Sequence, residues 1–395
     1  MQEMKPSSQK RDRKRKRRGN RHSTEAAPPL SPSVILFYNH RDSRVYSFSV
    51  YALNVAAVLE DNGDDTNSLP PPLFRFERKK FPTIPGYAAL GSKIYIFGGF
   101  NSAEACKDNP ALGAYSLDTY VFDTTEHLPP PSDDPKAFLL KGPSLNAPKT
   151  NPISVVFKGK IYVFPRRFSR QAVLLTSRTP VLGPKCEVLD PDHGSWTALP
   201  DPPLLDQHDR VKSRKDYTVV AYAVYDGMFV ASTARGIYCL NLDNPIKWNH
   251  LPLLAGFNRF PFIGKAISLD EKHYLAIHPS QHLLVKHDFT SEEGLVKEED
   301  SLDLQPGNQR YYNVDYNMVY LGDDKLLVIR SGLDKPLRKC PFVEESTNFI
   351  TYNIIQLKNK KKKKNQSGLV QLASSTFIMA DNPGTCGHPV ACFPM

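Results

Sequence analysis

Short apolar runs separated by polar turns recur along the chain. In SKIYIFGGF, residues 92–100, a polar turn precedes a β-prone run that ends in two glycines. KGKIYVFPRR at 158–167 has the same outline, and weaker copies stand at 226–233, 271–278 and 323–331. Another apolar stretch precedes each copy across a tight turn such as KG, DG or GDD. This pattern predicts a β-hairpin in every copy.

Two further strands are predicted after the hairpins. The third strand carries Tyr, any residue, an apolar residue and a small or acidic residue, as in DTYVFD at 118–123. KCEVLD keeps the end of this pattern but has Glu187 at the Tyr position. The fourth strand carries Trp followed by Leu-Pro, and the only two tryptophans, Trp196 and Trp248, occupy the same position in their copies. Copies that recur at the intervals given above, with loops inserted between them, predict a propeller or a related array.

This order of strands and motifs resembles the kelch repeat, and the resemblance covers roughly residues 33–380. It implies an all-β, kelch-type β-propeller of four-stranded blades that stack to bury two apolar faces each. Only Gly98-Gly99 keeps the double glycine, and we expect a structural role for it, because a tight turn needs positive φ. The structural repeat positions are Gly98, Gly99, Tyr120, Trp196, Tyr238 and Trp248.

Six blades are predicted. Five complete repeats begin near residues 85, 152, 217, 262 and 314. An incomplete one opens the chain, with VILFY as its second strand, RVYSFSV as its third and NVAAVLE as its fourth. We expect STFIMA at 375–380 to supply its missing first strand, so that the N- and C-terminal strands close one blade. The predicted domains are a disordered basic tail at 1–32, the propeller at 33–380 and a flexible C-terminal tail at 381–395.

Composition agrees with many short strands. The 395 residues include 34 Pro and 22 Gly, and 40% are apolar, which suits strands joined by turns better than long helices. No run is long and apolar enough to suggest a membrane span, and we expect no secretion signal. The six dispersed cysteines are interpreted as reduced thiols of an intracellular protein. Cys386, His388 and Cys392 in TCGHPVAC are interpreted as part of the flexible tail rather than as a zinc site.

The positive charge is concentrated in two short segments, 5–21 and 358–364. The formal net charge is +10, and removing residues 1–22 and the lysine run leaves a mildly acidic body. The N-terminal run is open to three interpretations: a solvated disordered tail, a nuclear-import signal at 10–18 that would place the protein in the nucleus as well as the cytoplasm, or non-specific nucleic-acid contact. This basic import or nucleic-acid patch contains Arg11, Arg13, Lys14, Arg15, Lys16, Arg17, Arg18, Lys360, Lys361, Lys362, Lys363 and Lys364.

The long loops are predicted to emerge on one face of the propeller. They follow the second strands or join blades, and loops on a rigid scaffold often carry binding groups. Two of them are rich in cations that suit carboxylates or phosphates, although ordinary solvated loop charge is the alternative. The candidate partner-binding residues are Arg166, Arg167, Arg170, Arg178, Arg210, Lys212, Arg214 and Lys215. Both basic segments are predicted to emerge on the opposite face.

No catalytic constellation is visible in the sequence. The copper ligands of the galactose-oxidase relatives of kelch proteins cannot be assembled, and the histidines at 273, 278, 282 and 287 share no clean strand face. We therefore expect no enzyme activity, no metal and no cofactor. The resemblance implies a protein-protein interaction module, similar to plant F-box/kelch proteins but without a recognisable F-box. The alternative is a nuclear nucleic-acid-associated protein that uses the two basic segments.

Overall fold

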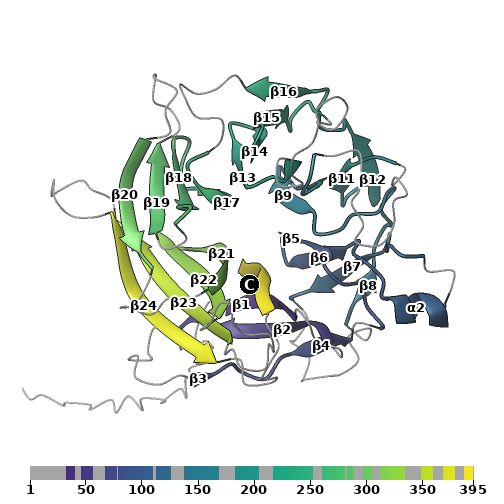
Figure 1. Cartoon of the computed structure of the whole chain (residues 1–395), viewed down its shortest axis with the longest axis horizontal. Helices are drawn as coiled ribbons and strands as arrows, with labels where there is room; N and C mark the ends of the chain where they lie inside the picture. The colour runs from purple at the N-terminus through teal and green to yellow at the C-terminus, as the bar shows by residue number, and fades with distance from the viewer. Residues whose placement is uncertain are drawn as a thin grey trace, which may run out of the picture. The chain divides into compact units, whose positions relative to one another are not determined.

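Almost every element of the structure, a computed structural model, is a β-strand (Figure 1). Pro32–Met395 form one compact unit, and Met1–Ser31 form a second, which lies outside the described residues. The structure describes residues 33–40, 46–56, 67–77, 79–109, 113–125, 138–168, 183–203, 217–251, 260–280, 283–288, 297–304, 312–333, 348–358, 368–378 and 387–394. Within the larger unit the sheets follow one another around a common centre, as the blades of a β-propeller do (Figure 1).

We number the sheets from one to six around the common centre, beginning with the sheet that contains Ser33–His40. The second, third and fourth sheets are antiparallel, and their strands pair in chain order. The second sheet contains β5 (Gly86–Leu90), β6 (Lys93–Phe97), β7 (Thr119–Asp123) and β8 (Leu140–Lys141). The third contains β9 (Ile153–Phe157), β10 (Lys160–Phe164), β11 (Cys186–Asp190) and β12 (Ser195–Leu199). The fourth contains β13 (Ala221–Tyr225), β14 (Met228–Thr233), β15 (Gly236–Asn241) and β16 (Trp248–Leu251).

The fifth and sixth sheets continue this order. The fifth contains β17 (Ile263–Ser268), β18 (His273–Ile277), β19 (Leu283–Asp288) and β20 (Lys297–Asp303). It joins the fourth through a short parallel pairing of β13 with β17. The sixth contains β21 (Tyr312–Gly322), β22 (Lys325–Leu333), β23 (Asn348–Leu357) and β24 (Leu369–Ile378), and β3 (Asn67–Ser68) pairs with β24.

The hairpin turns have the backbone geometry that the turn residues predict. Lys158 and Gly159 both have positive φ, as do Asp226 and Gly227, and as do both residues of the Asp323-Asp324 pair. Two consecutive positive φ values define the type I′ turn, whose twist matches that of antiparallel strands. The predicted hairpins β9–β10, β13–β14 and β21–β22 are therefore confirmed.

The first sheet corrects two strand assignments. It contains β1 (Ser33–His40), β2 (Tyr46–Asn54), β4 (Phe74–Glu77) and β25 (Gly387–Pro394), in the order β25-β1-β2-β4. The prediction of NVAAVLE as its fourth strand was wrong, because β2 runs on to Asn54 and FRFE in β4 pairs with it instead. The pairing of β25 with β1 places the last described strand of the chain beside the first.

Within the predicted flexible tail at 381–395, Gly387–Pro394 form a strand, so the prediction is wrong for these residues. STFIMA belongs mostly to β24, which lies between β23 and β3 in the sixth sheet. β25 occupies the place in the first sheet that the sequence analysis assigned to STFIMA. Pro389 and Pro394 obscure this strand in the sequence, since proline lacks the N–H that a ladder uses. β25 pairs with β1 alone, so it lies at a sheet edge, where proline is tolerated.

The hydrophobic core is divided into clusters between neighbouring sheets. Five clusters lie between consecutive sheets, from the first to the sixth. A sixth cluster combines Leu36 and Tyr51 of the first sheet with Leu327 and Tyr352 of the sixth. The second strands are buried on both sides, which explains why runs such as KIYIF and KIYVF are continuously apolar.

Among the labelled elements of the described residues in Figure 1, one is a helix and the others are strands. The helix is α2 (Ala103–Asp108), in the long loop after β6, and the Ser102 side chain caps it by accepting a hydrogen bond from the Ala105 N–H over 3.0 Å. In the described part of the chain, no helix has the length and apolar character that crossing a membrane requires.

Candidate functional site

Arg166 and Arg167 lie where β10 ends, at the end of the third sheet that is opposite the β9–β10 turn. The Arg166 carbonyl oxygen accepts a hydrogen bond from the Val219 N–H over 2.9 Å, and Arg167 forms a β-bridge with Thr218. The segment that leads into β13 therefore holds this backbone in place. The Arg167 side chain is exposed and that of Arg166 is half-buried.

The backbone of Arg166 is hydrogen-bonded to Val219, three residues before Tyr222 on the same segment. Burial raises the pKa of Tyr222, and the positive charge of Arg166 acts against this rise. The Arg166 Nε is buried and has no hydrogen-bond partner within the structure. This donor is therefore unsatisfied, whereas the half-buried guanidinium group presents its other donors in the same plane.

The other candidate partner-binding residues lie outside the described residues, so the predicted arginine cluster is described only at Arg166 and Arg167. They are Arg170, Arg178, Arg210, Lys212, Arg214 and Lys215. The same holds for the whole basic patch, Arg11 to Arg18 and Lys360 to Lys364.

Lys358 marks where the lysine run leaves β23. Its N–H donates to the Gly368 carbonyl over 2.7 Å, next to the β21–β22 turn, where the Leu357 N–H donates to Asp324 over 2.7 Å. Lys358 therefore lies at the turn end of the sixth sheet, whereas Arg166 lies at the opposite end of the third. Lys360–Lys364 and most of the Arg-rich loop lie outside the described residues, so the separation of the two stays a prediction.

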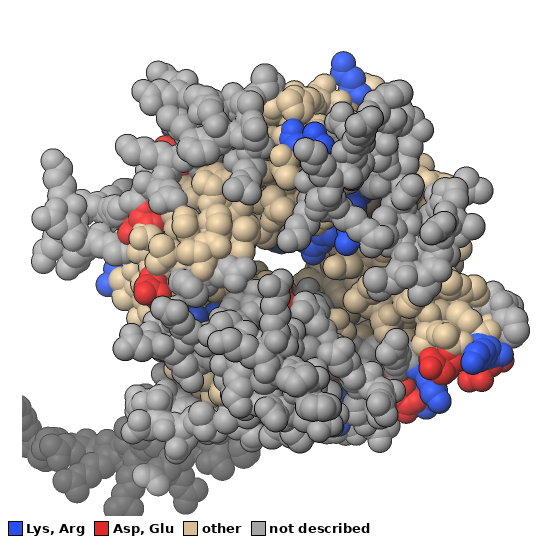
Figure 2. All heavy atoms as spheres, viewed as in Figure 1, with Lys and Arg blue, Asp and Glu red and all other residues tan. Residues whose placement is uncertain are grey.

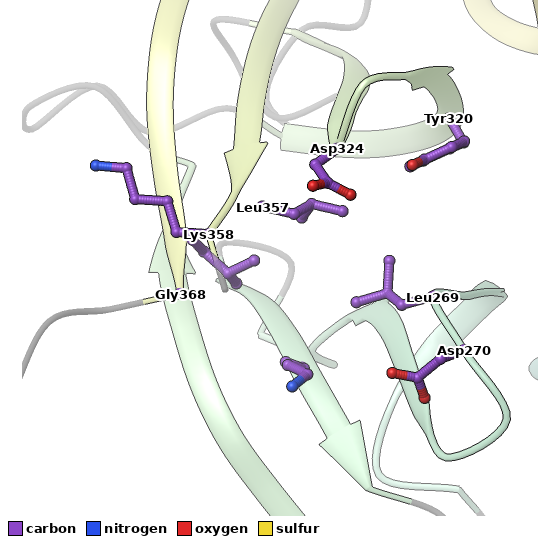
Figure 3. A pocket seen from close by; sticks show the side chains of 9 residues that line it. Leu269, Asp270, Tyr320, Asp324, Leu357, Lys358 and Gly368 are labelled. Atoms are coloured by element: carbon purple, nitrogen blue, oxygen red, sulfur yellow. The ribbon is translucent and has the colours of Figure 1, made fainter. Parts of the chain in front are cut away.

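A cavity of about 310 Å³ opens beside Lys358, between the fifth and sixth sheets. In Figure 3 the carboxylates of Asp270 and Asp324 and the Tyr320 hydroxyl lie around this space, while the Lys358 side chain extends away from it. Lys286 also lines the cavity.

The lining residues include the carboxylates of Asp270 and Asp324 and two lysines, of which Lys358 extends its ammonium group away from the cavity. Burial acts to raise the pKa of Asp270, but hydrogen bonds from the His273 ring and from the N–H groups of Lys272 and His273 lower it to about 2. The Asp270 carboxylate is thus already engaged by its own turn.

Glu187, the residue that departs from the Tyr pattern, forms a buried ion pair with Lys149. The Lys149 Nζ lies 2.5 Å from Glu187 Oε1, and both side chains are almost fully buried. The carboxylate also accepts hydrogen bonds from the Asn146 N–H and side-chain amide and from the Ala147 N–H. This network ties the connector between the second and third sheets to β11.

The Lys149–Glu187 pair is saturated and therefore structural. Besides Glu187, the Lys149 ammonium donates to the carbonyl oxygens of Ala147 over 2.9 Å and Pro184 over 2.8 Å, which uses all three of its protons. Burial lowers the pKa of Lys149, while Glu187 acts to raise it. Cys186 beside it is fully buried, and burial raises the pKa of its thiol well above the usual value, which makes it a poor nucleophile.

The repeat positions make repeated contacts. The Trp196 ring on β12 packs against Phe97 at the end of β6 (5.5 Å between centroids), and the Trp248 ring on β16 packs against Phe164 at the end of β10 (5.8 Å). Each tryptophan therefore contacts the second strand of the preceding sheet. Of the two repeat tyrosines, Tyr120 donates from its hydroxyl to Asp118 over 3.3 Å, whereas the Tyr238 ring packs near Phe168.

Gly98 and Gly99 have φ values of +69° and +102°, the conformation that the sequence analysis assigned to them. A Cβ at Gly98 would stand 2.6 Å from the Lys149 carbonyl oxygen, and one at Gly99 would stand 2.8 Å from Pro82 Cβ. The Gly99 N–H donates to that same Lys149 oxygen over 2.7 Å. The close approach of the connector therefore requires glycine here.

The histidines of the fifth sheet do not converge. The His273 ring lies 2.8 Å from Asp270, the His278 ring lies 2.8 Å from the Ser280 hydroxyl, and His287 is fully buried. His282 lies outside the described residues. Within the described ranges no three His, Cys, Asp or Glu side chains are grouped as metal ligands would be. The four described cysteines, Cys106, Cys186, Cys239 and Cys392, are free thiols.

Comparison with known proteins gives a family match for the sequence. A family model described as "Protein of unknown function (DUF1668)" matches residues 133–377. This range runs from before β8 into β24 and so covers most of the repeats. No curated protein matches the chain.

Several solved structures are similar over most of the chain. A Bacteroides fragilis protein, provisionally assigned as a 6-phosphogluconolactonase, is 11% identical with a TM-score of 0.43, over 94% of this chain and 100% of that chain. Hsv2p of Kluyveromyces lactis is 9% identical with a TM-score of 0.30, over 89% and 85%. BamB of Moraxella catarrhalis is 8% identical with a TM-score of 0.30, over 71% and 63%. At these values the likenesses carry no argument about function.

Proposed function

This chain belongs to the DUF1668 family, and we propose that it is a non-catalytic protein-interaction module, a scaffold or substrate adaptor of the kelch type. Its partner binds at the end of the propeller where Arg166 and Arg167 lie. The observation that carries this proposal is Arg167, whose exposed side chain stands on a backbone fixed by its bridge to Thr218. A positioned arginine loses little entropy on pairing with a carboxylate of a partner.

The buried polar groups favour a binding protein over an enzyme. The ion pair of Lys149 and Glu187 uses its donors and acceptors within the protein, and burial raises the pKa of the Cys186 thiol well above its usual value. A catalytic lysine or cysteine needs an accessible, activated side chain. These groups instead stabilise the connection between two sheets.

A second candidate function is association with nucleic acid through the segments 5–21 and 358–364. Lys358, the described residue that precedes the lysine run, supports this candidate because it lies at the opposite end of the sheets from Arg166. A basic surface there would be separate from the arginine end. The same segments would suit an import receptor and a nuclear location.

Charge reversal at Arg167 tests the main proposal. Partners crosslinked to the full chain in cells and identified by mass spectrometry are compared between wild type, Arg167→Glu and Lys272→Glu. Lys272 is the matched control, because its side chain is also exposed. It lies in the β17–β18 turn of the fifth sheet, whereas Arg167 lies at the end of the third sheet that is opposite the turns. We expect a partner that is lost from Arg167→Glu and kept by Lys272→Glu.

Equal capture by all three proteins would contradict the arginine end as the binding surface. Deletion of residues 1–22 and 358–364 addresses the second candidate. If the captured material is nucleic acid, is lost on these deletions and weakens steeply with salt, the nucleic-acid function replaces the main proposal.

A further inference from the structure

Lys265 and Tyr222 are neighbours across the join of the fourth and fifth sheets. They are Cα partners in the parallel pairing of β13 with β17, so their side chains lie on the same side of the joined sheet. Tyr222 packs on the cluster between the third and fourth sheets. Ala266, the next residue along β17, belongs to the cluster on the other side. Lys265 is thereby directed to the side of Tyr222.

The strand is irregular at Lys265. The pairing of β17 with β18 shifts register between Ile263 and Ile267, and Gly264 has a φ of +72°. Bulges of this kind redirect a side chain and are frequent beside binding sites. A Cβ placed at Gly264 would meet no atom within 4 Å, so there is unfilled space next to Lys265.

The Lys265 side chain is exposed to solvent, yet surrounding protein atoms lower the pKa of its ammonium group by desolvation. The exposed Lys265 side chain and the unfilled space at Gly264 together define a recess of the surface. Figure 2 shows Lys and Arg side chains beside the opening in the middle of the molecule. β13 and β17 are first strands of their sheets, the position that faces the centre of a propeller.

No carboxylate neutralises this recess among the described residues. Lys149, Lys158 and Lys160 each form an ion pair with an acid, whereas Lys265 forms none there. The second cation is Arg166, which is close enough to the Tyr222 hydroxyl to influence its ionisation and has a buried Nε without a hydrogen-bond partner. Among the described residues, these two positive charges near one tyrosine have no counter-ion, which is unfavourable in a partly desolvated place.

We propose that Lys265, Arg166 and the Tyr222 hydroxyl form an anion-binding site for a small ligand that carries a phosphate or carboxylate group. Arginine offers a planar fork that fits two oxygens of such a group, lysine adds a compact charge, and the tyrosine hydroxyl donates one further hydrogen bond. A bound anion would supply the counter-charge that the described residues lack. The site does not depend on the protein partner proposed above, because the ligand sits in the recess and not on the exposed Arg167.

The test is a calorimetric titration of the full chain with inorganic phosphate and, separately, with citrate, at low ionic strength. We expect saturable binding of at least one probe to wild type. Lys265→Met should weaken it by about 10-fold or more, because it removes a charge-assisted bond. Lys272→Met, which removes an equally exposed lysine in the β17–β18 turn, should bind as wild type does. The probe that binds more tightly distinguishes a phosphate from a carboxylate ligand.

A thermal melt separates loss of the site from loss of the fold. Without added anion, Lys265→Met should melt at the same or a higher temperature than wild type, because it removes an uncompensated ammonium group from the recess. Arg166→Lys keeps the charge but loses the fork, and it should bind the preferred probe more weakly. The proposal is overturned if wild type binds neither probe saturably, or if Lys265→Met and Lys272→Met bind alike.

Discussion

The indole N–H of Trp248 donates a hydrogen bond to the carbonyl oxygen of Pro200 over 2.9 Å. Trp196 repeats this contact one sheet earlier, donating to the Pro143 carbonyl over 3.0 Å. In both cases the acceptor directly follows or lies close after the fourth strand of the preceding sheet. Each repeat tryptophan therefore links two neighbouring sheets in two ways, through packing of its ring and through a hydrogen bond of its indole N–H.

Trp248→Phe should lower the free energy of unfolding by about 1 kcal/mol, because an aromatic ring remains among Phe164, Phe168 and Phe229 while the indole donor is lost. Urea unfolding measures the change. Trp248→Ala is the reference for loss of the ring as well and should cost more. Equal stability of wild type and Trp248→Phe would show that the hydrogen bond contributes nothing.

Lys149→Met should destabilise the fold by about 3–5 kcal/mol, because it leaves the Glu187 carboxylate buried without its counter-charge. Adding Glu187→Leu to that variant should recover much of the loss, since no buried charge then remains. Chemical unfolding of the two single variants and the double variant gives the coupling energy. Strictly additive losses would contradict the account of a mutually dependent pair.

His287 should make stability depend on pH. Both ring nitrogens are buried without a hydrogen-bond partner, and burial, with a smaller effect of His278, lowers its pKa to about 4. Between about pH 6.5 and pH 4 the unfolded chain binds a proton that the folded chain does not, so stability falls as the pH is lowered through this range. At pH 7 both states are neutral and the effect vanishes.

His287→Leu isolates this effect. Urea unfolding of wild type and variant at pH 7 and pH 5 should show that wild type loses about 2 kcal/mol more than the variant does on acidification. The variant keeps an apolar side chain beside Phe262, so its fold at pH 7 is expected to persist. If both proteins lose the same stability between the two pH values, His287 is not the group responsible.

Gly98→Ala should destabilise the protein more than Gly91→Ala does. Both glycines have positive φ, which costs an alanine about 1 kcal/mol. A Cβ at Gly91 meets nothing within 4 Å, whereas one at Gly98 would collide with the backbone oxygen of Lys149. Comparing the melting temperatures of the two variants separates the collision from the conformational cost. Matching melting temperatures would mean that the connector moves freely to accommodate the methyl group.

Local chemistry made much of the fold predictable. The residues Asp226-Gly227 predict a hairpin, because few residue types tolerate two positive φ values in succession. The second strands are buried on both faces, so they could be predicted from unbroken apolar runs in the sequence. β25 escaped prediction because its prolines are acceptable only at a sheet edge, and edge position is decided by the rest of the fold.

The contacts within the site were less accessible to sequence reasoning. Glu187 stood out as a departure from the pattern, but its partner Lys149 lies 38 residues away in a connector with no periodicity of its own. The sequence did not single out Lys265 as a binding residue, because its position depends on the bulge of β17 and on the pairing of β17 with the neighbouring sheet. Arg166 was predicted as a loop cation, whereas its relation to Tyr222 follows from the packing of two sheets.

The pairing of β25 with β1 has a consequence for the synthesis of the protein. His40 and Gly387 are register partners, so the first sheet lacks a strand until about 350 further residues have left the ribosome. Until then the β1 edge is an open template for other strands in the crowded cell. A premature stop codon just before Gly387 would therefore remove no strand of any other sheet and still release a chain prone to aggregate.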